Sequence, residues 1–231
     1  MRGTFSTGLH GLDDLLGGGL REHHITFFFG PGGSGKTNLL LWLAARALSI
    51  GGKVYWIETA GIPIQRLAHM SHGQEIDGEK TLNRLQVQKV RSLRTQEAAI
   101  NQACILSAKT SLRPAMIIVD SLTEFVRLHI RTNREPWALQ SLSMQMSYLR
   151  EAARSPGVMV STSGQTWIDY TTGRVLPVAE RTLEGWEDVR IEMQRTSINP
   201  TIIALRSTLK TECKSSECSL RLTSDGFQSV K

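Results

Sequence analysis

Cysteine and aromatic residues are scarce in this chain, and no hydrophobic run is long enough to cross a membrane. The three cysteines, Cys104, Cys213 and Cys218, are too few and too unevenly spaced for a disulfide scaffold. Cys213 and Cys218 stand at a predicted hairpin tip, where they are compatible with a disulfide and with two free thiols. No segment approaches the ~20 apolar residues of a membrane span, and no leader sequence is evident. We therefore expect a cytoplasmic protein without a membrane segment.

Internal repeats, low-complexity tracts and linkers are also missing, so we expect one domain over residues 1–231. Hydrophobic residues make up 40% and charged residues 21% of the chain, which is enough to bury a core. The formal net charge is +6. A basic balance favours polyanionic partners such as nucleic acid, and it is equally compatible with a solvated basic surface.

Apolar runs of strand length alternate with helical patterns along most of the chain. Strands are predicted at residues 24–29, 54–58, 85–90, 116–120 and 158–162, and helices at 36–49, 62–71, 95–110 and 137–154. Strands separated by helices imply a parallel sheet that is covered on both faces. Beyond residue 187, strand patterns at 189–193, 201–207 and 219–223 follow without helices. The sequence therefore predicts an α/β fold, mainly parallel, with antiparallel strands at its C-terminal edge.

Residues 30–37 match the phosphate-binding loop motif GxxxxGK[ST] and lie between a predicted strand and a predicted helix. Glycines in such a loop let successive N–H groups point inward, toward an anion at the helix N-terminus. In this motif the lysine approaches the β- and γ-phosphates and the hydroxyl residue binds magnesium. The predicted nucleotide-binding residues are Gly30, Pro31, Gly32, Gly33, Ser34, Gly35, Lys36 and Thr37.

A second metal-binding residue is expected at the end of a neighbouring strand. Asp120 follows the apolar run 116–119 and precedes a Ser-Leu-Thr segment. Ligands bind doubly wound sheets in the crevice at the carboxyl ends of the strands, where this aspartate would lie. An aspartate after a strand is also a common turn residue or helix cap. Together with the phosphate loop, however, Asp120 is best interpreted as the acid that holds magnesium through water.

With these motifs in place, the chain resembles the RecA/RadA recombinase family, and most closely the archaeal RadB-type paralogues. Segments similar to those of the family occur in the family's order along the chain. They are Ser-Thr-Gly at 6–8, the phosphate loop, Glu-Thr-Ala-Gly at 58–61, Ile-Val-Asp-Ser-Leu-Thr at 118–123, residues 172–186, and Leu-Thr-Ser-Asp-Gly-Phe at 222–227. The resemblance covers nearly the whole chain. It implies a RecA-like P-loop NTPase core that binds ATP and Mg²⁺.

The sequence departs from this family where a catalytic glutamate is usual. The family shows an acidic residue, a threonine and a glutamate after the second strand, whereas this chain has Glu58, Thr59 and Ala60. Loss of a general base typically slows a reaction by ~10²–10⁴-fold. Glu58 stands two residues before Ala60, so it would lie on the same strand face as Ala60 if the strand continues, and it is the alternative base. We therefore expect ATP binding with slow hydrolysis, with Lys36, Glu58 and Gln165 as the candidate catalytic residues.

Two further departures concern coupling and assembly. Recombinases have an Asn-Gln pair after the strand at 158–162, and its glutamine senses the γ-phosphate; this chain has Ser163, Gly164 and Gln165. Gln165 is either that sensor or a loop residue without a role. Nothing before residue 6 resembles a helix–hairpin–helix domain or a polymerisation linker, so self-polymerisation is not expected.

By resemblance, two loops near residues 126–136 and 166–181 face DNA. Basic groups interleaved with aromatic ones suit single-stranded DNA, and the alternative is a solvated basic rim. The candidate DNA-binding residues are Arg127, Arg131, Arg134, Trp167, Arg174 and Arg181. The resemblance also places Arg66 on the adenine ring as a cation–π partner, and an exposed helix arginine is the alternative.

Three functions from different classes fit these observations. The first is an ATP-binding recombinase paralogue that contacts DNA and modulates a full-length RadA-type recombinase. The second is a KaiC-like regulatory ATPase that acts through protein partners without DNA. The third is a scaffold in which the nucleotide is structural. Residues 172–186 resemble the recombinase paralogues and favour the first interpretation.

Overall fold

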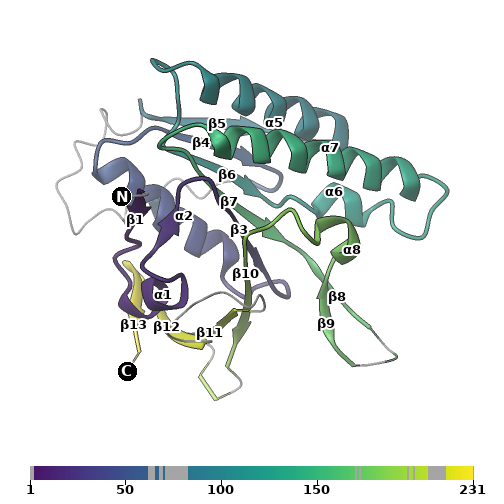
Figure 1. The fold of residues 1–231 in the computed structure, drawn as a ribbon. Helices are drawn as coiled ribbons and strands as arrows, with labels where there is room; N and C mark the ends of the chain where they lie inside the picture. The colour runs from purple at the N-terminus through teal and green to yellow at the C-terminus, as the bar shows by residue number, and fades with distance from the viewer. Residues whose placement is uncertain are drawn as a thin grey trace.

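The centre of the molecule is a twisted nine-stranded sheet with helices on both faces (Figure 1). The computed structural model describes residues 3–61, 66–67, 70, 83–169, 171, 173–196, 198–199, 201–207 and 217–230. The strand order of the sheet is β13-β12-β11-β10-β3-β7-β6-β4-β5. Two further pairs, β1 (Thr4–Phe5) with β2 (Leu20–Arg21) and β8 (Thr166–Ile168) with β9 (Val175–Pro177), form separate small sheets.

The sheet is parallel through its centre and antiparallel at one edge. The parallel strands are β3 (Ile25–Phe29), β4 (Val54–Glu58), β5 (Leu85–Lys89), β6 (Met116–Asp120), β7 (Met159–Gly164) and β10 (Val189–Arg195). The antiparallel strands are β11 (Ile202–Ser207), β12 (Glu217–Thr223) and β13 (Gly226–Ser229). This arrangement confirms the predicted α/β class, including the antiparallel C-terminal edge.

Alternating side chains of the central strands enter two separate hydrophobic clusters. In β6, Ile118 packs into the cluster beneath α1 (His10–Leu15) and α2 (Lys36–Ser49). Ile117 and Val119 pack into the opposite cluster, beneath α5 (Leu93–Ala108) and α7 (Glu135–Arg154). Because both faces are covered, β3 and β6 are apolar along most of their length, as buried parallel strands usually are. No described helix is long and apolar enough to span a bilayer.

Several predicted boundaries were wrong by a few residues, for local reasons. The helix predicted from residue 95 begins at Leu93, because the Ser92 hydroxyl caps it by accepting a hydrogen bond from the Thr95 N–H at 3.2 Å. The helix predicted from 137 begins at Glu135, with a proline in its first turn. Of the helix predicted at 62–71, the structure describes only residues 66, 67 and 70, which are helical.

The segment predicted as one loop at 166–181 contains regular structure. It forms an antiparallel hairpin of β8 (Thr166–Ile168) and β9 (Val175–Pro177), followed by the short helix α8 (Glu180–Leu183). The hairpin projects from the carboxyl end of β7, away from the sheet, next to the short helix α6 (Glu124–Arg127) (Figure 1).

Truncating one buried isoleucine tests this core. We expect Ile118→Ala to lower the free energy of unfolding by about 2–5 kcal/mol, because it leaves a cavity between β6 and α2. The matched control is Ile105→Ala on α5, since the Ile105 side chain is 44% exposed and should contribute within about 0.5 kcal/mol. Urea denaturation of both variants measures the difference. Equal losses would contradict this assignment of the core.

Candidate functional site

The phosphate-loop motif lies between β3 and α2, at the carboxyl edge of the parallel strands. Its glycines permit two close approaches by β10 and β11. A Cβ atom on Gly30 would lie 2.1 Å from the Met193 carbonyl oxygen. One on Gly35 would lie 2.4 Å from Cδ1 of Ile203, and Gly35 also has a left-handed φ of 99°. Larger residues at these two positions would displace the loop.

The Lys36 ammonium group is folded against the inside of this loop. It donates to the carbonyl oxygens of Gly30 at 2.7 Å and Pro31 at 3.0 Å, and to the Ser34 hydroxyl at 3.3 Å. Burial lowers the pKa of Lys36 below its ordinary value, and the carboxylate of Asp120 acts against that shift. The charge therefore lies inside the loop, close to the backbone that the motif uses for phosphates.

Asp120 accepts hydrogen bonds from two hydroxyl groups on other elements. Thr37 Oγ1 donates to one carboxylate oxygen at 2.8 Å, and Ser163 Oγ donates to the other at 2.5 Å. Burial raises the pKa of Asp120, whereas the hydrogen bonds from Ser163 and Thr37 and the charge of Lys36 lower it. The two predicted metal-binding residues, Thr37 and Asp120, are thus in direct contact.

Oxygen ligands of this kind suit magnesium, which prefers carboxylates, hydroxyls and water. Among the residues that the structure describes, no group of three or more His, Cys, Asp or Glu side chains could hold a metal ion. A magnesium ion beside Thr37 and Asp120 would therefore take most of its ligands from water and from nucleotide phosphates. The residues present fit that kind of site.

Glu58 lies beside Asp120 in the sheet, as the register of β4 and β6 requires. Its Oε2 atom accepts a hydrogen bond from the Gly61 N–H, so the buried carboxylate stabilises the turn after β4. Thr59 joins the same corner, since its N–H donates to the Asp120 carbonyl at 3.0 Å. Ala60 is exposed at the bend that follows. The role of Glu58 as a base stays a prediction.

Gln165 follows β7 directly and contacts the segment after β6. Its N–H donates to the Thr123 hydroxyl at 2.8 Å, and its side-chain amide donates to Glu124 at 3.1 Å. Glu124 and Ser163 were not predicted as site residues. Only the placement of β6 next to β7 brings them to the site, and no motif in the sequence singles out either residue.

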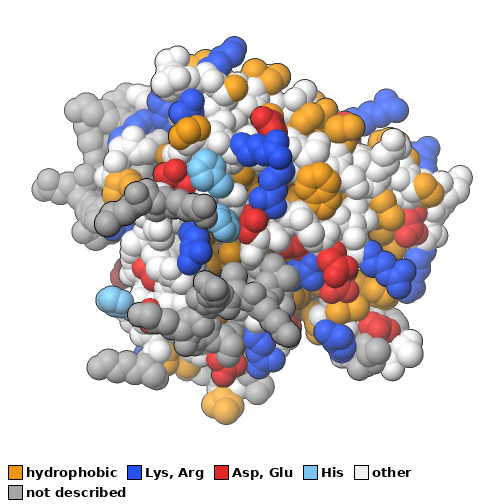
Figure 2. All heavy atoms as spheres, in the orientation of Figure 1, with side chains coloured by type: hydrophobic (Ala, Val, Ile, Leu, Met, Phe, Trp, Pro, Cys, Tyr) orange, Lys and Arg blue, Asp and Glu red, His pale blue; other side chains and the backbone are white. Residues whose placement is uncertain are grey.

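The predicted DNA-facing residues are exposed on one side of the molecule. Figure 2 shows Lys and Arg side chains there, mixed with hydrophobic and acidic ones, around α6, α8 and the β8–β9 hairpin. The Arg131 guanidinium lies 5.8 Å from the centre of the Trp167 ring, so the two predicted loops are in contact. The exposed residues are Arg127, Arg131, Arg134, Trp167, Arg174 and Arg181.

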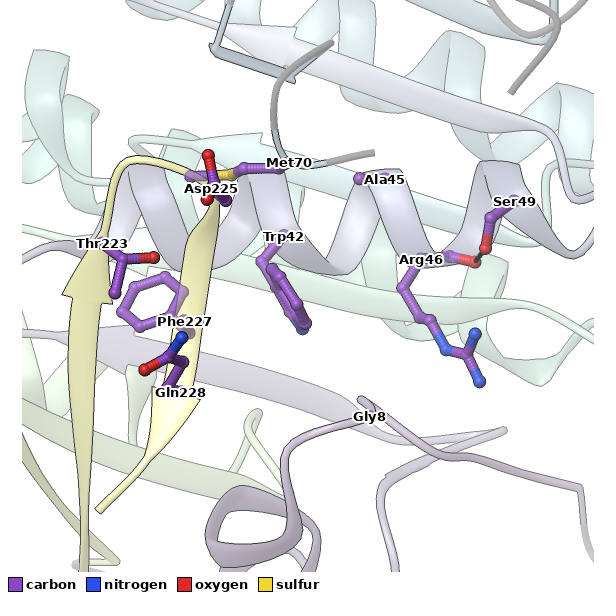
Figure 3. A pocket seen from close by; sticks show the side chains of 10 residues that line it. All are labelled: Gly8, Trp42, Ala45, Arg46, Ser49, Met70, Thr223, Asp225, Phe227 and Gln228. Atoms are coloured by element: carbon purple, nitrogen blue, oxygen red, sulfur yellow. Dashed lines mark hydrogen bonds between the residues drawn. The ribbon is translucent and has the colours of Figure 1, made fainter. Parts of the chain in front are cut away.

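A cavity of about 460 Å³ lies along the outer face of α2, beyond the phosphate loop. Trp42 and Arg46 project into it from α2, opposite Gly8 and the β12–β13 hairpin (Figure 3). The Trp42 indole N–H donates to the Thr7 carbonyl at 2.8 Å. Arg66 borders this cavity, since it donates to the carbonyl of Thr223 in its lining at 3.4 Å. Its contact with a base stays a prediction.

Another contact near the phosphate loop comes from the end of β10. Arg195 Nε donates to the carbonyl oxygen of Gly33 at 2.5 Å, which ties the β10–β11 turn to the loop. The sequence offers no motif that would have singled out this arginine. The contact depends on β10 lying next to β3 in the sheet.

A mainly parallel sheet in this strand order, with the phosphate-loop motif between β3 and α2 and an acid at the end of β6, defines a RecA-like α/β core. Residues 3–228 match the family model described as Rad51, and the chain belongs to that family.

The curated relatives agree with this assignment. RadB from Methanococcoides burtonii is 28% identical over 94% of each chain. RadB from Pyrococcus furiosus is 32% identical over 86% of this chain and 84% of its own. RadB from Archaeoglobus fulgidus is 29% identical over 96% of each chain. All three are named DNA repair and recombination proteins. The predicted resemblance to RadB-type paralogues is confirmed.

The hydrogen bond from Ser163 can be tested by removing its hydroxyl. We expect Ser163→Ala to raise the pKa of Asp120 further, because the carboxylate loses a donor that favours its charged form. The variant should therefore lose more stability than the parent as the pH rises above the ordinary carboxyl range, where Asp120 must be charged while buried. Carboxyl-carbon NMR titration measures the pKa.

The matched control is Ser161→Ala on the same strand. The Ser161 hydroxyl is buried and makes no hydrogen bond within the described part of the chain. It should leave the titration of Asp120 unchanged. An unchanged pKa in Ser163→Ala would show that this hydroxyl does not support the carboxylate.

Proposed function

We propose that this protein is an ATP-binding recombinase paralogue that contacts DNA in repair and recombination. The observation that carries the proposal is the contact between Thr37 and Asp120, 2.8 Å apart, beside the buried Lys36. These are the hydroxyl, carboxylate and ammonium groups that P-loop ATPases use around magnesium and phosphate. They come from two segments of the chain and meet at the carboxyl edge of the sheet.

Each of these side chains has a defined task in the proposed site. Lys36 would exchange its contacts with loop carbonyls for contacts with β- and γ-phosphate oxygens. Thr37 and Asp120 would hold magnesium, directly and through water respectively. Bound magnesium would neutralise phosphate charge, and Ser163 would keep the Asp120 carboxylate in place.

The proposed rate of hydrolysis is low. Ala60 occupies the position where the family usually has a catalytic glutamate, and its methyl group cannot accept a proton. The nearby Glu58 carboxylate is already engaged by the Gly61 N–H. ATP therefore serves mainly as a bound effector that changes the affinity of the protein for a partner.

The proposed DNA surface consists of α6 with its Arg127, the loop between α6 and α7, the β8–β9 hairpin and α8. Arginine side chains there can neutralise phosphates, and the 43% exposed ring of Trp167 can stack on a base. Arg131 lies over that ring and joins the two elements. Because a base can stack on the Trp167 ring only when it is not stacked within a duplex, this surface favours single-stranded DNA.

The names of the relatives suggest the cellular context. RadB proteins are named for DNA repair and recombination, and we assign this chain the same role. A full-length recombinase of the RadA type is the proposed protein partner, since a slow ATPase is better suited to modulating strand exchange than to driving it.

DNA binding with and without ATP tests the proposal directly. We expect single-stranded DNA to bind more tightly with ATP and magnesium, and this gain to disappear in Lys36→Ala. Trp167→Ala should weaken binding about 5- to 150-fold, the equivalent of ~1–3 kcal/mol per stacked base. Fluorescence anisotropy at several salt concentrations measures both effects.

The control for charge and surface position is Arg154→Ala, because Arg154 is exposed at the end of α7 and pairs with Glu151. It should change affinity little. Absent binding at low salt, or binding unaffected by nucleotide and by Trp167→Ala, would exclude nucleotide-gated DNA binding.

A glutamate at position 60 tests the account of slow hydrolysis. We expect Ala60→Glu to raise the turnover of ATP, by up to ~10²–10⁴-fold if the carboxylate reaches the attacking water. Phosphate release measures the rate, with Glu58→Ala as the companion variant. Turnover that is fast in the parent and survives in Glu58→Ala would overturn this account. Turnover lost only in Glu58→Ala would identify Glu58 as the base.

A further inference from the structure

The carboxylate of Glu124 connects Gln165, directly after β7, to Arg127 at the end of α6. One oxygen accepts a hydrogen bond from the Gln165 amide at 3.1 Å, and the other accepts one from the Arg127 guanidinium at 3.2 Å. Glu124 is the first residue of α6, and its side chain is 28% exposed, against 49% for Arg127. The Glu124 side chain therefore holds both Gln165 and Arg127, one with each carboxylate oxygen.

A short series of contacts links Glu124 to the phosphate loop. In the register of β3 and β7, Phe29 pairs with Gly164, so Gln165 comes next to Gly30 at the start of the loop. Ser163, two residues before Gln165, donates to Asp120, which in turn accepts from Thr37. The backbone of Gln165 thus lies next to the start of the phosphate loop, and its amide is a neutral donor that Glu124 holds.

We propose that Glu124 is a positioning residue that restrains both Gln165 and Arg127 and thereby couples nucleotide binding to DNA binding. The inference rests on the proposed function. Glu124 competes with a terminal phosphate for the Gln165 amide, and with DNA phosphates for the Arg127 guanidinium. Glu124 is therefore not a ligand of either molecule but an acceptor that both must displace.

The two contacts support each other, which gives the coupling its sign. An exposed ion pair is weak because two long side chains must lose rotamer freedom to form it. The Gln165 contact already fixes the Glu124 side chain, so Arg127 pairs with an ordered acceptor. When a phosphate takes the Gln165 amide, Glu124 becomes freer and its hold on Arg127 weakens. Nucleotide should then favour DNA binding, and by reciprocity DNA should favour nucleotide.

The first test uses nucleotide alone. We expect Glu124→Ala to increase the affinity for a non-hydrolysable ATP analogue about two- to fivefold, and to leave the affinity for ADP unchanged. The gain should vanish in a Gln165→Ala background, which makes this a double-mutant cycle. A purely structural role for Glu124 would change the affinities for both nucleotides together. An unchanged ratio of ATP-analogue to ADP affinity, or a gain that persists without Gln165, would overturn the proposal.

The second test measures single-stranded DNA affinity with and without the ATP analogue. In Glu124→Ala we expect tighter binding without nucleotide, and an effect of nucleotide that falls from about fivefold toward none. Glu135→Gln is the matched control, because Glu135 contacts the same loop through the Arg131 N–H at 2.6 Å but is not bonded to Gln165. It removes the same charge and should keep the parent's response to nucleotide.

The outcomes separate the two proposals. Absence of DNA binding in every variant would refute the proposed function, while the nucleotide measurement would still decide whether Glu124 restrains Gln165. DNA binding whose nucleotide response survives in Glu124→Ala would refute the coupling and leave the proposed function standing.

Discussion

The hydrogen bond from Thr37 to Asp120 joins the two halves of the site, and the rest of the site depends on it. Thr37 lies in the first turn of α2, which follows β3, and Asp120 ends β6; the strand between β3 and β6 in the sheet is β7. The contact forms only because all three strands run in the same direction and end at the same edge. Ser163, near the end of β7, donates a hydrogen bond to the same carboxylate. A change in the order or direction of these strands would separate every group that the site requires.

Burial gives this arrangement its electrostatic character. Lys36 and Asp120 are both shielded from solvent, and burial shifts the pKa of each toward its neutral form. The charge of each opposes this shift in the other, and the hydroxyl groups of Ser163 and Thr37 oppose it in Asp120. Under the proposed function, this site receives highly charged groups. Phosphates would take the place of the loop carbonyls that now accept from Lys36, and a divalent cation would take the place of the hydroxyl donor beside Asp120.

The polar residues after β6 and β7 extend this network toward the exposed basic side. Glu124 comes shortly after Asp120, and Gln165 shortly after Ser163, so each strand end places one residue in the proposed phosphate site and another beyond it. The Arg131–Trp167 contact then joins the loop after α6 to the β8–β9 hairpin. The proposed nucleotide and DNA sites would thus lie close together at the ends of β6 and β7, which is the physical basis of the proposed coupling.

The sequence by itself determined the α/β class, the phosphate-loop motif and Asp120, because these depend on local patterns: apolar runs, glycine spacing and an acid after a buried strand. It also determined the resemblance to RadB-type proteins. Only the tertiary structure decided that Ser163 supports Asp120, that Glu58 is bonded to the Gly61 N–H, and that Glu124 holds Gln165 and Arg127. These contacts join residues that are adjacent only through the strand order and register of the sheet, and a short polar side chain in a sequence does not specify which distant partner it will face.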